Sequence, residues 1–448
     1  MFSFSLDWIG NGFMKILLIG NGFDLAHGLP TSYKNFLDFC SRVRKIYEFA
    51  PNIPLAKYKQ ENLDTWEIDS SISRVLLAAF EKRKWHRKKM DSENYDEYFE
   101  TPNDILNELY SHIKQNAWIN YFNNIILKLG ENWIDFENEI SKVIQALDSG
   151  RFQIESGGSI TNVEQYHSER IISLLKVSKN NLKAITTIEE MDKFVVYLNG
   201  ELERLLRALE IYISEFINNI DITDKCKDIE SLNIDTVLSF NYSDTFHRIY
   251  DTENKHEYDY IHGKADINKN IQTCNLVLGI DEYLDDELKN YELEFLPFKK
   301  YYQRIYKTTE NKHLNWIDEI KEGFFNFQRK IENAYETTVQ SIKDGSLGNY
   351  PFQKNVCHEL LNAECPQHTL YIFGHSLDVS DKDVLKMFIS NDNVQTKIFY
   401  YRKTENDKTE LGKIIRNLIR IIGQDELVRR TGGLHKTIEF IPQSLNLK

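Results

Sequence analysis

The hydrophobic pattern divides the chain into two kinds of sequence. Short apolar runs that end in a polar or glycine-containing turn and lead into a helical pattern occur at Lys15–Ile19, at Thr236–Phe240 and again toward the C-terminus. Runs this short are typical of strands buried on both faces of a parallel sheet. From about residue 51 to 230 the sequence is instead polar, aromatic and helical. We therefore predict an α/β fold, in which an open, parallel, Rossmann-like sheet carries a large inserted α-helical domain.

The same pattern predicts the domain limits. Residues 1–13 form an N-terminal extension, residues 14–50 and 231–448 form an α/β nucleotide-binding domain, and residues 51–230 form the helical insertion. A second helical insertion is expected within the α/β domain, at about 301–345. Further strands are predicted at Tyr258–His262, Asn275–Ile280, Thr369–Phe373, Thr396–Tyr401 and Thr437–Ile441.

The helical insertion contains two strong amphipathic patterns. Apolar residues recur at helical spacing over Tyr121–Leu147, with an interruption at Gly130, and over Leu198–Ile220. The stretch Gly150–Asn162 is the most linker-like part of the insertion. The dense basic run Glu81–Met90 could bind nucleic acid, but a solvated helix face or loop is the favoured interpretation.

Composition narrows the classes of partner. The 68 acidic residues outnumber the 55 basic ones, and the formal net charge of −13 disfavours non-specific binding to nucleic acid or to an anionic membrane. No apolar stretch approaches the roughly 20 residues of a membrane span, and the N-terminus lacks a signal-peptide pattern, so we expect a cytoplasmic protein. The five cysteines include no C-x-x-C pair, so neither disulfides nor a structural zinc site is predicted.

The turn after the first strand has the form of a nucleotide-binding βα turn. Gly20 and Gly22 allow a sharp turn and the close approach of a ligand, and Thr31 or Ser32 can cap the helix that follows. Backbone amides at such a turn can hold a pyrophosphate. Leu25 occupies the third glycine position of the fingerprint G-x-G-x-x-G, so a tight turn without a ligand is the alternative.

Polar residues follow several of the predicted strands. In open parallel sheets ligands bind beyond the carboxyl ends of the strands. Asn241 could hold a ribose hydroxyl or a water there, or it could cap the next helix. His262 could act as a general base near neutral pH, with a structural histidine as the alternative. The residues at or just after strand ends, which we expect to converge on one crevice, are Asn21, Asn241, His262, Asp281 and Ser376.

Two further segments offer candidate site residues. Asp135 and Glu137 lie on the polar side of a predicted helix, where they could face a ligand or form ordinary surface charge. The sequence GHSLD departs from the hydrolase elbow G-x-S-x-G at Asp378, so no catalytic triad is assigned. Ser376 fits better as part of a polar rim for a ribose or phosphate, and Asp378 or Asp381 as a helix cap.

The segments IGNGFDLAHGLPTSY, WIDFE, FNYSDT, IHG and FGHSLDVSD occur in the order seen in the AbiH family of bacterial abortive-infection proteins. The chain resembles this family over most of its length. More distantly it resembles the SIR2-like NAD-binding fold, with Asn241 and His262 where that fold has its motif Asn and catalytic His. Ser243 replaces the acid of its N-Y-D motif, with Asp244 one residue later, and the zinc-binding cysteines of the protein deacylases are absent.

This resemblance implies an antiphage effector that hydrolyses NAD+ at the glycosidic bond to nicotinamide, with Asn241 and His262 as catalytic residues. NAD+ is then the substrate, and no prosthetic group or metal is expected. Analogy with SIR2-like effectors implies control through a homo-oligomer or a phage-derived trigger. The implied nucleotide-binding residues are Gly20, Asn21, Gly22, Phe23, Asp24, Thr31, Ser32, Gly374, His375 and Ser376, with Asp135, Glu137, Asp244, Asp281, Asp378 and Asp381 as further candidates.

Three other functions stay open on the sequence. A nucleotide-sensing module would bind NAD+ or ADP-ribose in the same pocket without turnover. A nuclease would need clustered acids and a divalent metal, and its support is the basic run Lys82–Lys89 together with Asp135 and Glu137. A serine hydrolase would rest on Ser376.

Overall fold

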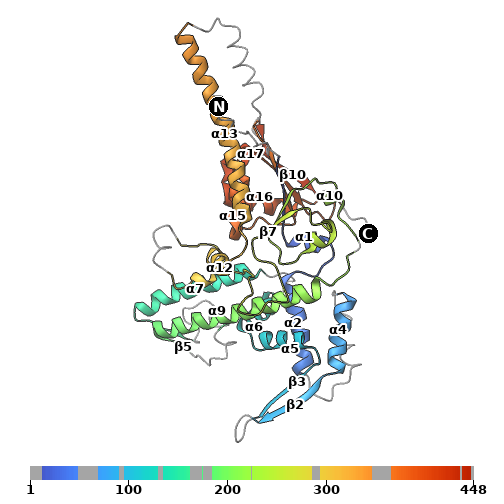
Figure 1. The fold of residues 1–448 in the computed structure, drawn as a ribbon. Helices are drawn as coiled ribbons and strands as arrows, with labels where there is room; N and C mark the ends of the chain where they lie inside the picture. Colours follow the sequence, from blue (N-terminus) through green and yellow to red (C-terminus); the bar gives the residue numbers. More distant parts are fainter. Residues whose placement is uncertain are drawn as a thin grey trace, which may run out of the picture.

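The computed structural model describes residues 13–48, 69–89, 95–129, 135–161, 174, 184–222, 224–284, 293–345, 365–433 and 436–444. Within these residues, a six-stranded sheet has the order β10-β9-β8-β1-β6-β7, and every pairing in it is parallel (Figure 1). The predicted parallel α/β fold is therefore confirmed. The strands are β1 (Lys15–Ile19), β6 (Thr236–Ser239), β7 (Glu257–Tyr260), β8 (His368–Phe373), β9 (Val394–Tyr400) and β10 (Ile438–Pro442).

Strand β1 is central and buried on both faces, which explains its continuous apolar sequence. Because side chains alternate along a strand, Ile16 and Leu18 face one hydrophobic core, and Leu17 and Ile19 face another. Helices from the C-terminal part of the chain cover the first face: α13 (Lys312–Lys343), α15 (Lys382–Ile389), α16 (Thr409–Ile422) and α17 (Gln424–Thr431). Three short helices cover the second face: α1 (Asn21–Ala26), α10 (Lys227–Glu230) and α11 (Thr245–Tyr250).

The inserted helices form a separate layered body with one hydrophobic core (Figure 1). Its longest helix, α9, begins with a capping box in which Thr187 and Glu190 bond each other's backbone N–H, and it continues into a π-helix over Tyr212–Ile217. The helices of this body are α2 (Tyr33–Glu48), α4 (Ser70–Glu81), α5 (Asp104–Ile113), α6 (Ala117–Leu129), α7 (Phe136–Glu155) and α9 (Ile188–Ile211).

Helix α2 shares this core, although the sequence pattern groups it with the sheet domain. The loop that follows β7 reaches the same core through Ala265 and Leu276. The exact domain limits remain a prediction. The second helical insertion is present as α12 (Lys300–Tyr306) and α13, and the far half of α13 extends away from the sheet (Figure 1).

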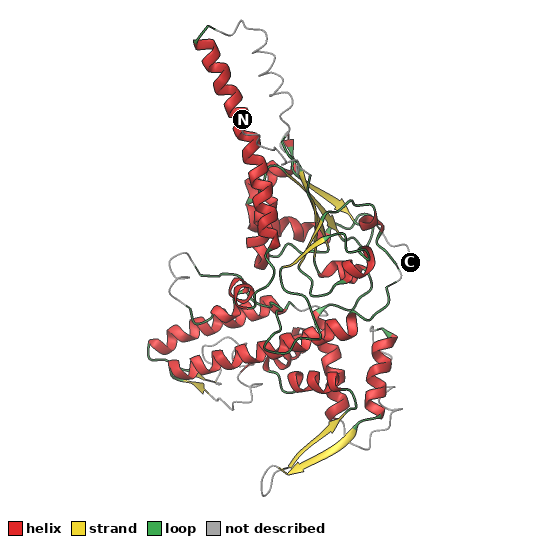
Figure 2. Ribbon diagram, viewed as in Figure 1, coloured by secondary structure: helices red, strands yellow, loops and turns green. Residues whose placement is uncertain are grey.

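Three local predictions were wrong: the strand at Asn275–Ile280, the helix or loop at the basic run Glu81–Met90, and the linker at Gly150–Asn162. Asn275–Ile280 contains no strand; instead Val277 N–H donates to the His262 carbonyl, and Ile280 forms an isolated bridge with Lys299. The basic run contains the strand β2 (Lys84–Lys89), which pairs with β3 (Tyr95–Glu100) in a projecting hairpin (Figure 2).

The predicted linker at Gly150–Asn162 begins inside α7, which continues to Glu155. A short antiparallel pair, β4 (Ile160–Thr161) with β5 (Ala184–Ile185), follows it. The N-terminal extension lies outside the described residues, apart from Phe13. Among the helices that the structure describes, none is long and apolar enough to cross a membrane.

Candidate functional site

The turns that follow β1 and β8 pack backbone against backbone. Gly20 N–H donates to Phe373 O at 3.2 Å, and Gly22 N–H donates to Gly374 O at 2.8 Å. A Cβ on Gly22 would lie 2.8 Å from Gly374 Cα, and a Cβ on Gly374, whose φ is +70°, would lie 2.1 Å from Phe23 N. The glycines are thus required by the contact between the two turns. The two amides that we expected to hold a pyrophosphate already donate to carbonyl groups.

Asn241 holds this paired turn from the neighbouring strand. Its Nδ2 donates to Gly20 O at 3.0 Å, and α11 begins after Asp244 without a side-chain cap, so Asn241 does not cap that helix. Next to it, Ser243 Oγ donates to the buried Asp24 Oδ2 at 2.6 Å. Burial raises the pKa of Asp24 to about 6, against the opposing effect of hydrogen bonds from Ser243, Thr245 and Asn241.

A second group of polar side chains meets beside these turns, and we call it the Asp381 cluster. Asp381 Oδ1 lies 2.7 Å from Lys300 Nζ and 3.1 Å from His262 Nε2, and its Oδ2 lies 3.5 Å from His375 Nε2. The members come from the segments that follow β7 and β8, the start of α12 and the start of α7, so the sheet domain and the inserted helices both contribute. They are Glu137, His262, Lys300, His375, Ser380 and Asp381.

Asp381 is held as a carboxylate. Burial alone would raise its pKa, but the Lys300 ammonium and His262 hold the pKa of Asp381 well below its usual range. Leu377 N–H donates to His375 Nδ1 at 2.9 Å, so the proton of a neutral His375 is on Nε2, which faces Asp381. Leu377 itself has a φ of +53°, a strained conformation for a leucine.

The same reasoning assigns the tautomer of His262. Its Nε2 faces the Asp381 carboxylate, which can only accept, so the proton of the neutral imidazole is on Nε2. Nδ1 then carries the lone pair, and no described residue donates a hydrogen bond to it. An anionic carboxylate behind a histidine with a free nitrogen is the arrangement of a general base.

Lys300 lies between two carboxylates. Its Nζ is 2.7 Å from Asp381 and 2.8 Å from Glu137, and it donates to Ser380 Oγ at 3.0 Å. Although burial lowers the pKa of Lys300, the two carboxylates raise it above its usual value. Burial raises the pKa of Glu137, against the opposing effect of Lys300. The ammonium of Lys300 thus lies between the carboxylates of Glu137 and Asp381 and separates them.

Several predicted residues have local structural contacts. Asp135 caps α7 by accepting from Asn138 N–H at 3.1 Å, and Asp378 accepts from Ser380 N–H at 3.0 Å at the start of a 3-10 turn. Thr31 Oγ1 donates to Asn21 Oδ1 at 2.6 Å. Ser32 caps α2, as predicted for Thr31 or Ser32, because its Oγ accepts from Asn35 N–H at 3.2 Å.

Other candidates lie apart from the cluster. Phe23 is fully buried against Phe246 and Phe373. Asp244 pairs with Lys264 at 3.4 Å, and Asp281 lines a separate cavity of about 420 Å³. The Ser376 side chain is exposed, and its carbonyl accepts from Asn417 Nδ2 at 3.0 Å.

Sequence reasoning missed Lys300 and Ser380. Lys300 is only 2% exposed, but in the sequence it stands among other lysines and tyrosines and reads as a surface residue. Ser380 could have been found, because it lies in the segment FGHSLDVSD that already contains Asp381. In the described part of the chain, no group of three or more His, Cys, Asp or Glu side chains is arranged to hold a metal ion.

The family model described as "Bacteriophage abortive infection AbiH" matches residues 16–401, which extend from β1 to just past the end of β9 and include every member of the Asp381 cluster. No curated protein and no solved structure matches the chain.

Proposed function

This chain belongs to the bacteriophage abortive infection family AbiH, and from that membership we propose that it is a phage-defence effector that hydrolyses NAD+ to nicotinamide and ADP-ribose. The family itself indicates a function in phage abortive infection. The NAD+ cleavage is the proposal, and the chemistry of the Asp381 cluster supports it.

The proposed reaction breaks the bond between nicotinamide and the ribose C1′ and joins a water oxygen to that carbon. The nicotinamide ring is cationic in NAD+, so it leaves as a neutral molecule and needs no acid. The protein must instead stabilise the positive charge that develops on the ribose, orient one water and accept its proton.

The observation that carries the proposal is the contact between His262 and Asp381 at the carboxyl end of a parallel sheet. With Nε2–H directed at the Asp381 carboxylate at 3.1 Å, His262 Nδ1 can accept the proton of a water or of a ribose hydroxyl. The imidazolium that forms is stabilised by the same carboxylate. Base catalysis of this kind contributes about 10²- to 10⁴-fold to a rate.

The neighbouring groups have supporting roles in this proposal. Glu137 is the more exposed of the two carboxylates, since 17% of its side chain is exposed against 8% for Asp381, and it would face the developing positive charge. Asn241 would keep the turn after β1 in position through Gly20 O. We assign no phosphate contact to the Gly20 and Gly22 amides, because both already donate hydrogen bonds to backbone carbonyls.

The cluster is closed in this conformation. The side chains of Lys300 and His262 are 2% and 6% exposed, and the pairs of Lys300 with Glu137 and with Asp381 connect the inserted helices to the sheet. A substrate would have to separate α7 from the turn after β8. Such closure is in keeping with an enzyme that stays inactive until a trigger opens the cluster. The trigger would be a phage component or the assembly of several copies.

The alternatives have less support. The basic strand β2 is opposed by an acidic partner strand, with Arg87 Nε 3.1 Å from Glu97 Oε1, which weakens the case for nucleic acid. The exposed Ser376 has no histidine partner among the described residues. A sensor that binds NAD+ without turnover would use the same residues, so only a turnover measurement separates it from the enzyme.

The test is the NAD+ content of host cells that express the protein, before and after phage challenge. We expect NAD+ to fall with the wild type and to be retained with His262→Ala, and we expect the purified wild type to release nicotinamide and ADP-ribose. His86→Ala, on the exposed hairpin, is the matched control and should behave as the wild type. Growth arrest with unchanged NAD+ would overturn the proposal.

A further inference from the structure

A second cavity lies along β7, the edge strand of the sheet, outside the Asp381 cluster. Its volume is about 660 Å³, within the range of roughly 300–1,000 Å³ that small-molecule sites occupy. The walls come from β7, α11, the turn after α11, the loop after β7 and the start of α13. The lining residues that matter here are Lys255, Lys264 and Lys312, His247 and His256, and Tyr258 and Tyr260.

The cationic lining is unusual for a chain with a net charge of −13. Two glutamates also line the cavity, but each already has a partner. Glu257 Oε2 accepts from Trp316 Nε1 at 2.8 Å, and Glu310 lies 3.3 Å from Lys312. The lysines are paired as well: Lys312 with Glu310, Lys264 with Asp244 at 3.4 Å and Lys255 with Glu253 at 2.5 Å, but Asp244 and Glu253 do not line the cavity. Within the lining, three lysines therefore stand against two glutamates, which favours an anionic ligand.

The backbone of β7 adds hydrogen-bond donors. Ile261 N–H bonds to Ser239 O in the sheet, and since alternate residues of a parallel strand face the same neighbour, the backbone groups of Tyr258 and Tyr260 face outward. The outward carbonyls are already used: Tyr258 O accepts from Lys312 Nζ and Tyr260 O from Gly263 N–H, both at 2.9 Å. The edge therefore presents donors to the cavity and is blocked for pairing with another strand.

Tyr258 and Tyr260 also line the cavity with two aromatic side chains. Their rings lie 5.9 Å apart and only 14° from parallel, and Lys264 Nζ lies 5.5 Å from the centre of the Tyr260 ring. Aromatic rings of this kind stack with nucleic bases, and lysines beside them bind phosphate. We propose that the β7 edge cavity is a binding site for a nucleotide, with its phosphates on Lys264 and Lys312 and its base against the two tyrosines.

The cavity is connected to the Asp381 cluster by the segment that follows β7. His262 belongs to the cluster, and Gly263 and Lys264 line the cavity. Gly263 has a φ of +78°, and a Cβ on it would lie 2.3 Å from Asn275 O, so this segment has no room to shift independently of Asn275, which also lines the cavity. A bound nucleotide would therefore influence the position of His262, a consequence that rests on the proposed function.

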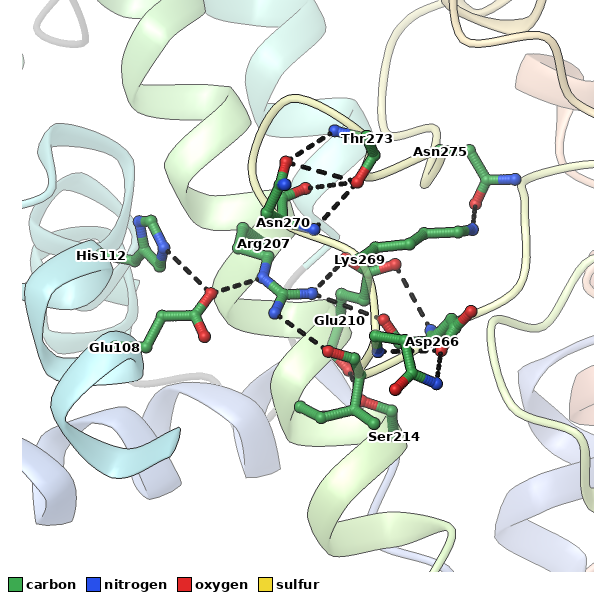
Figure 3. A network of polar contacts seen from close by, with 12 residues as sticks. Glu108, His112, Arg207, Glu210, Ser214, Asp266, Lys269, Asn270, Thr273 and Asn275 are labelled. Atoms are coloured by element: carbon green, nitrogen blue, oxygen red, sulfur yellow. Dashed lines mark hydrogen bonds and ion pairs between the residues drawn. The ribbon is translucent and has the colours of Figure 1, made fainter. Parts of the chain in front are cut away.

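The far part of the same loop is attached to the helical body by the network in Figure 3. Arg207 on α9 donates to Asp266 O and Ile267 O, each at 3.4 Å, and Lys269 Nζ donates to Asn275 Oδ1 at 2.5 Å (Figure 3). Asp266 N–H in turn donates to Glu210 Oε1 at 3.4 Å. One wall of the cavity is thus fixed to the inserted helices.

The test is calorimetric titration of the full chain with ADP, with adenosine and with inorganic pyrophosphate. We expect one site for ADP and weaker binding of the two fragments. The double variant Lys264→Ala/Lys312→Ala should lose about tenfold or more in affinity for ADP, as expected for the loss of charge-assisted hydrogen bonds. Lys321→Ala/Lys386→Ala, which removes two lysines from the 420 Å³ cavity, is the matched control and should bind as the wild type.

His262→Ala separates this site from the cluster. If that variant loses ADP binding while Lys264→Ala/Lys312→Ala keeps it, the nucleotide binds in the cluster and the proposal is wrong. No binding of ADP at millimolar concentration would also overturn it. Should the double variant fail to fold, the single change Lys264→Ala, at a side chain that is 42% exposed, gives the same comparison. Since ADP has no nicotinamide to release, these outcomes do not depend on NAD+ cleavage.

Discussion

Among the described residues, Arg207 and Lys300 are both cations buried against carboxylates, and they differ in what else they touch. In the helical body, Arg207 lies 2.8 Å from both Glu108 and Glu210, and its other donors end on backbone carbonyls (Figure 3). In the Asp381 cluster, Lys300 shares its carboxylates with two imidazoles and a hydroxyl.

The difference separates a structural network from a candidate site. A guanidinium has five donors and no acceptor and stays charged, so the Arg207 network can hold segments together but cannot move a proton. The Asp381 cluster contains His262, whose Nδ1 has a lone pair that can accept a proton. Burial of charge is common to both, and it therefore does not by itself identify a functional site.

The largest expected effect is on activity, and it follows removal of the Asp381 charge. Asp381→Asn keeps the shape of the side chain but no longer fixes the His262 tautomer or stabilises its charged form. We expect the proposed NAD+ hydrolysis to fall by about 10²- to 10⁴-fold. Nicotinamide release by the purified variant measures this. Asp392→Asn, which alters an exposed partner of Arg429, should retain activity, and equal activity in both variants would count against the role of Asp381.

The next effect is on stability, and it tests the other network. Arg207→Met leaves Glu210 buried without a cation, and we expect the free energy of unfolding to fall by about 3–5 kcal/mol. Urea unfolding followed by circular dichroism measures the change. The double variant Arg207→Met/Glu210→Leu should recover part of the loss, since no unpaired charge then remains at that point. A single variant as stable as the wild type would show that the network contributes little.

Asp24 adds a third case to the two buried networks, because it is a buried carboxyl group with no cation beside it among the described residues. Its pKa is about 6 in the folded protein against 3.8 as the ordinary value, so between about pH 4 and 6 the folded state keeps a proton that the unfolded chain has lost. Stability must then decrease as the pH rises through this window and stay lower above it. The shift corresponds to about 3 kcal/mol at pH 7.

Asp24→Asn should remove this dependence, because an asparagine can still accept from Ser243 and carries no charge. We expect the stability of the variant relative to the wild type to increase between pH 4 and 7, by up to about 3 kcal/mol. Denaturant unfolding at several pH values measures the difference. A constant difference across this range would show that Asp24 titrates as an ordinary aspartate.

The parts of the fold that the sequence predicted are those governed by local pattern. The apolar runs at β1, β6 and β8 were readable because a strand buried on both faces has few polar positions. The run at Asn275–Ile280 is also apolar, but not because it forms a strand. It packs in the core of the inserted helices, and the Gln303 side chain hydrogen-bonds both backbone groups of Leu278, so no strand partner is needed.

The site was only partly predictable. His262 and Asp381 stand in recognisable segments, whereas Lys300 joins them from a segment with no distinctive pattern. Its burial depends on carboxylates that are distant in sequence, and a single lysine gives no sign of such partners. Gly20, Gly22 and Gly374 were predicted as site residues. Their role in packing the turn after β1 against the turn after β8 can be recognised only once β1 and β8 are known to be neighbours.

The smallest effect is expected where charge is paired at the surface. Arg87 and Glu97 on the projecting hairpin are about half exposed, so Arg87→Ala should change the free energy of unfolding by less than about 1 kcal/mol. It should also leave NAD+ hydrolysis unchanged, because the hairpin lies far along the helical body from the cluster (Figure 1). The same variant tests the nuclease alternative, since a hairpin that binds nucleic acid would lose affinity when a cation is removed. If this variant loses phage protection but keeps NAD+ hydrolysis, the hairpin binds a partner. An exposed ion pair would then matter for function, and the contrast between buried and exposed charge would not account for the whole function.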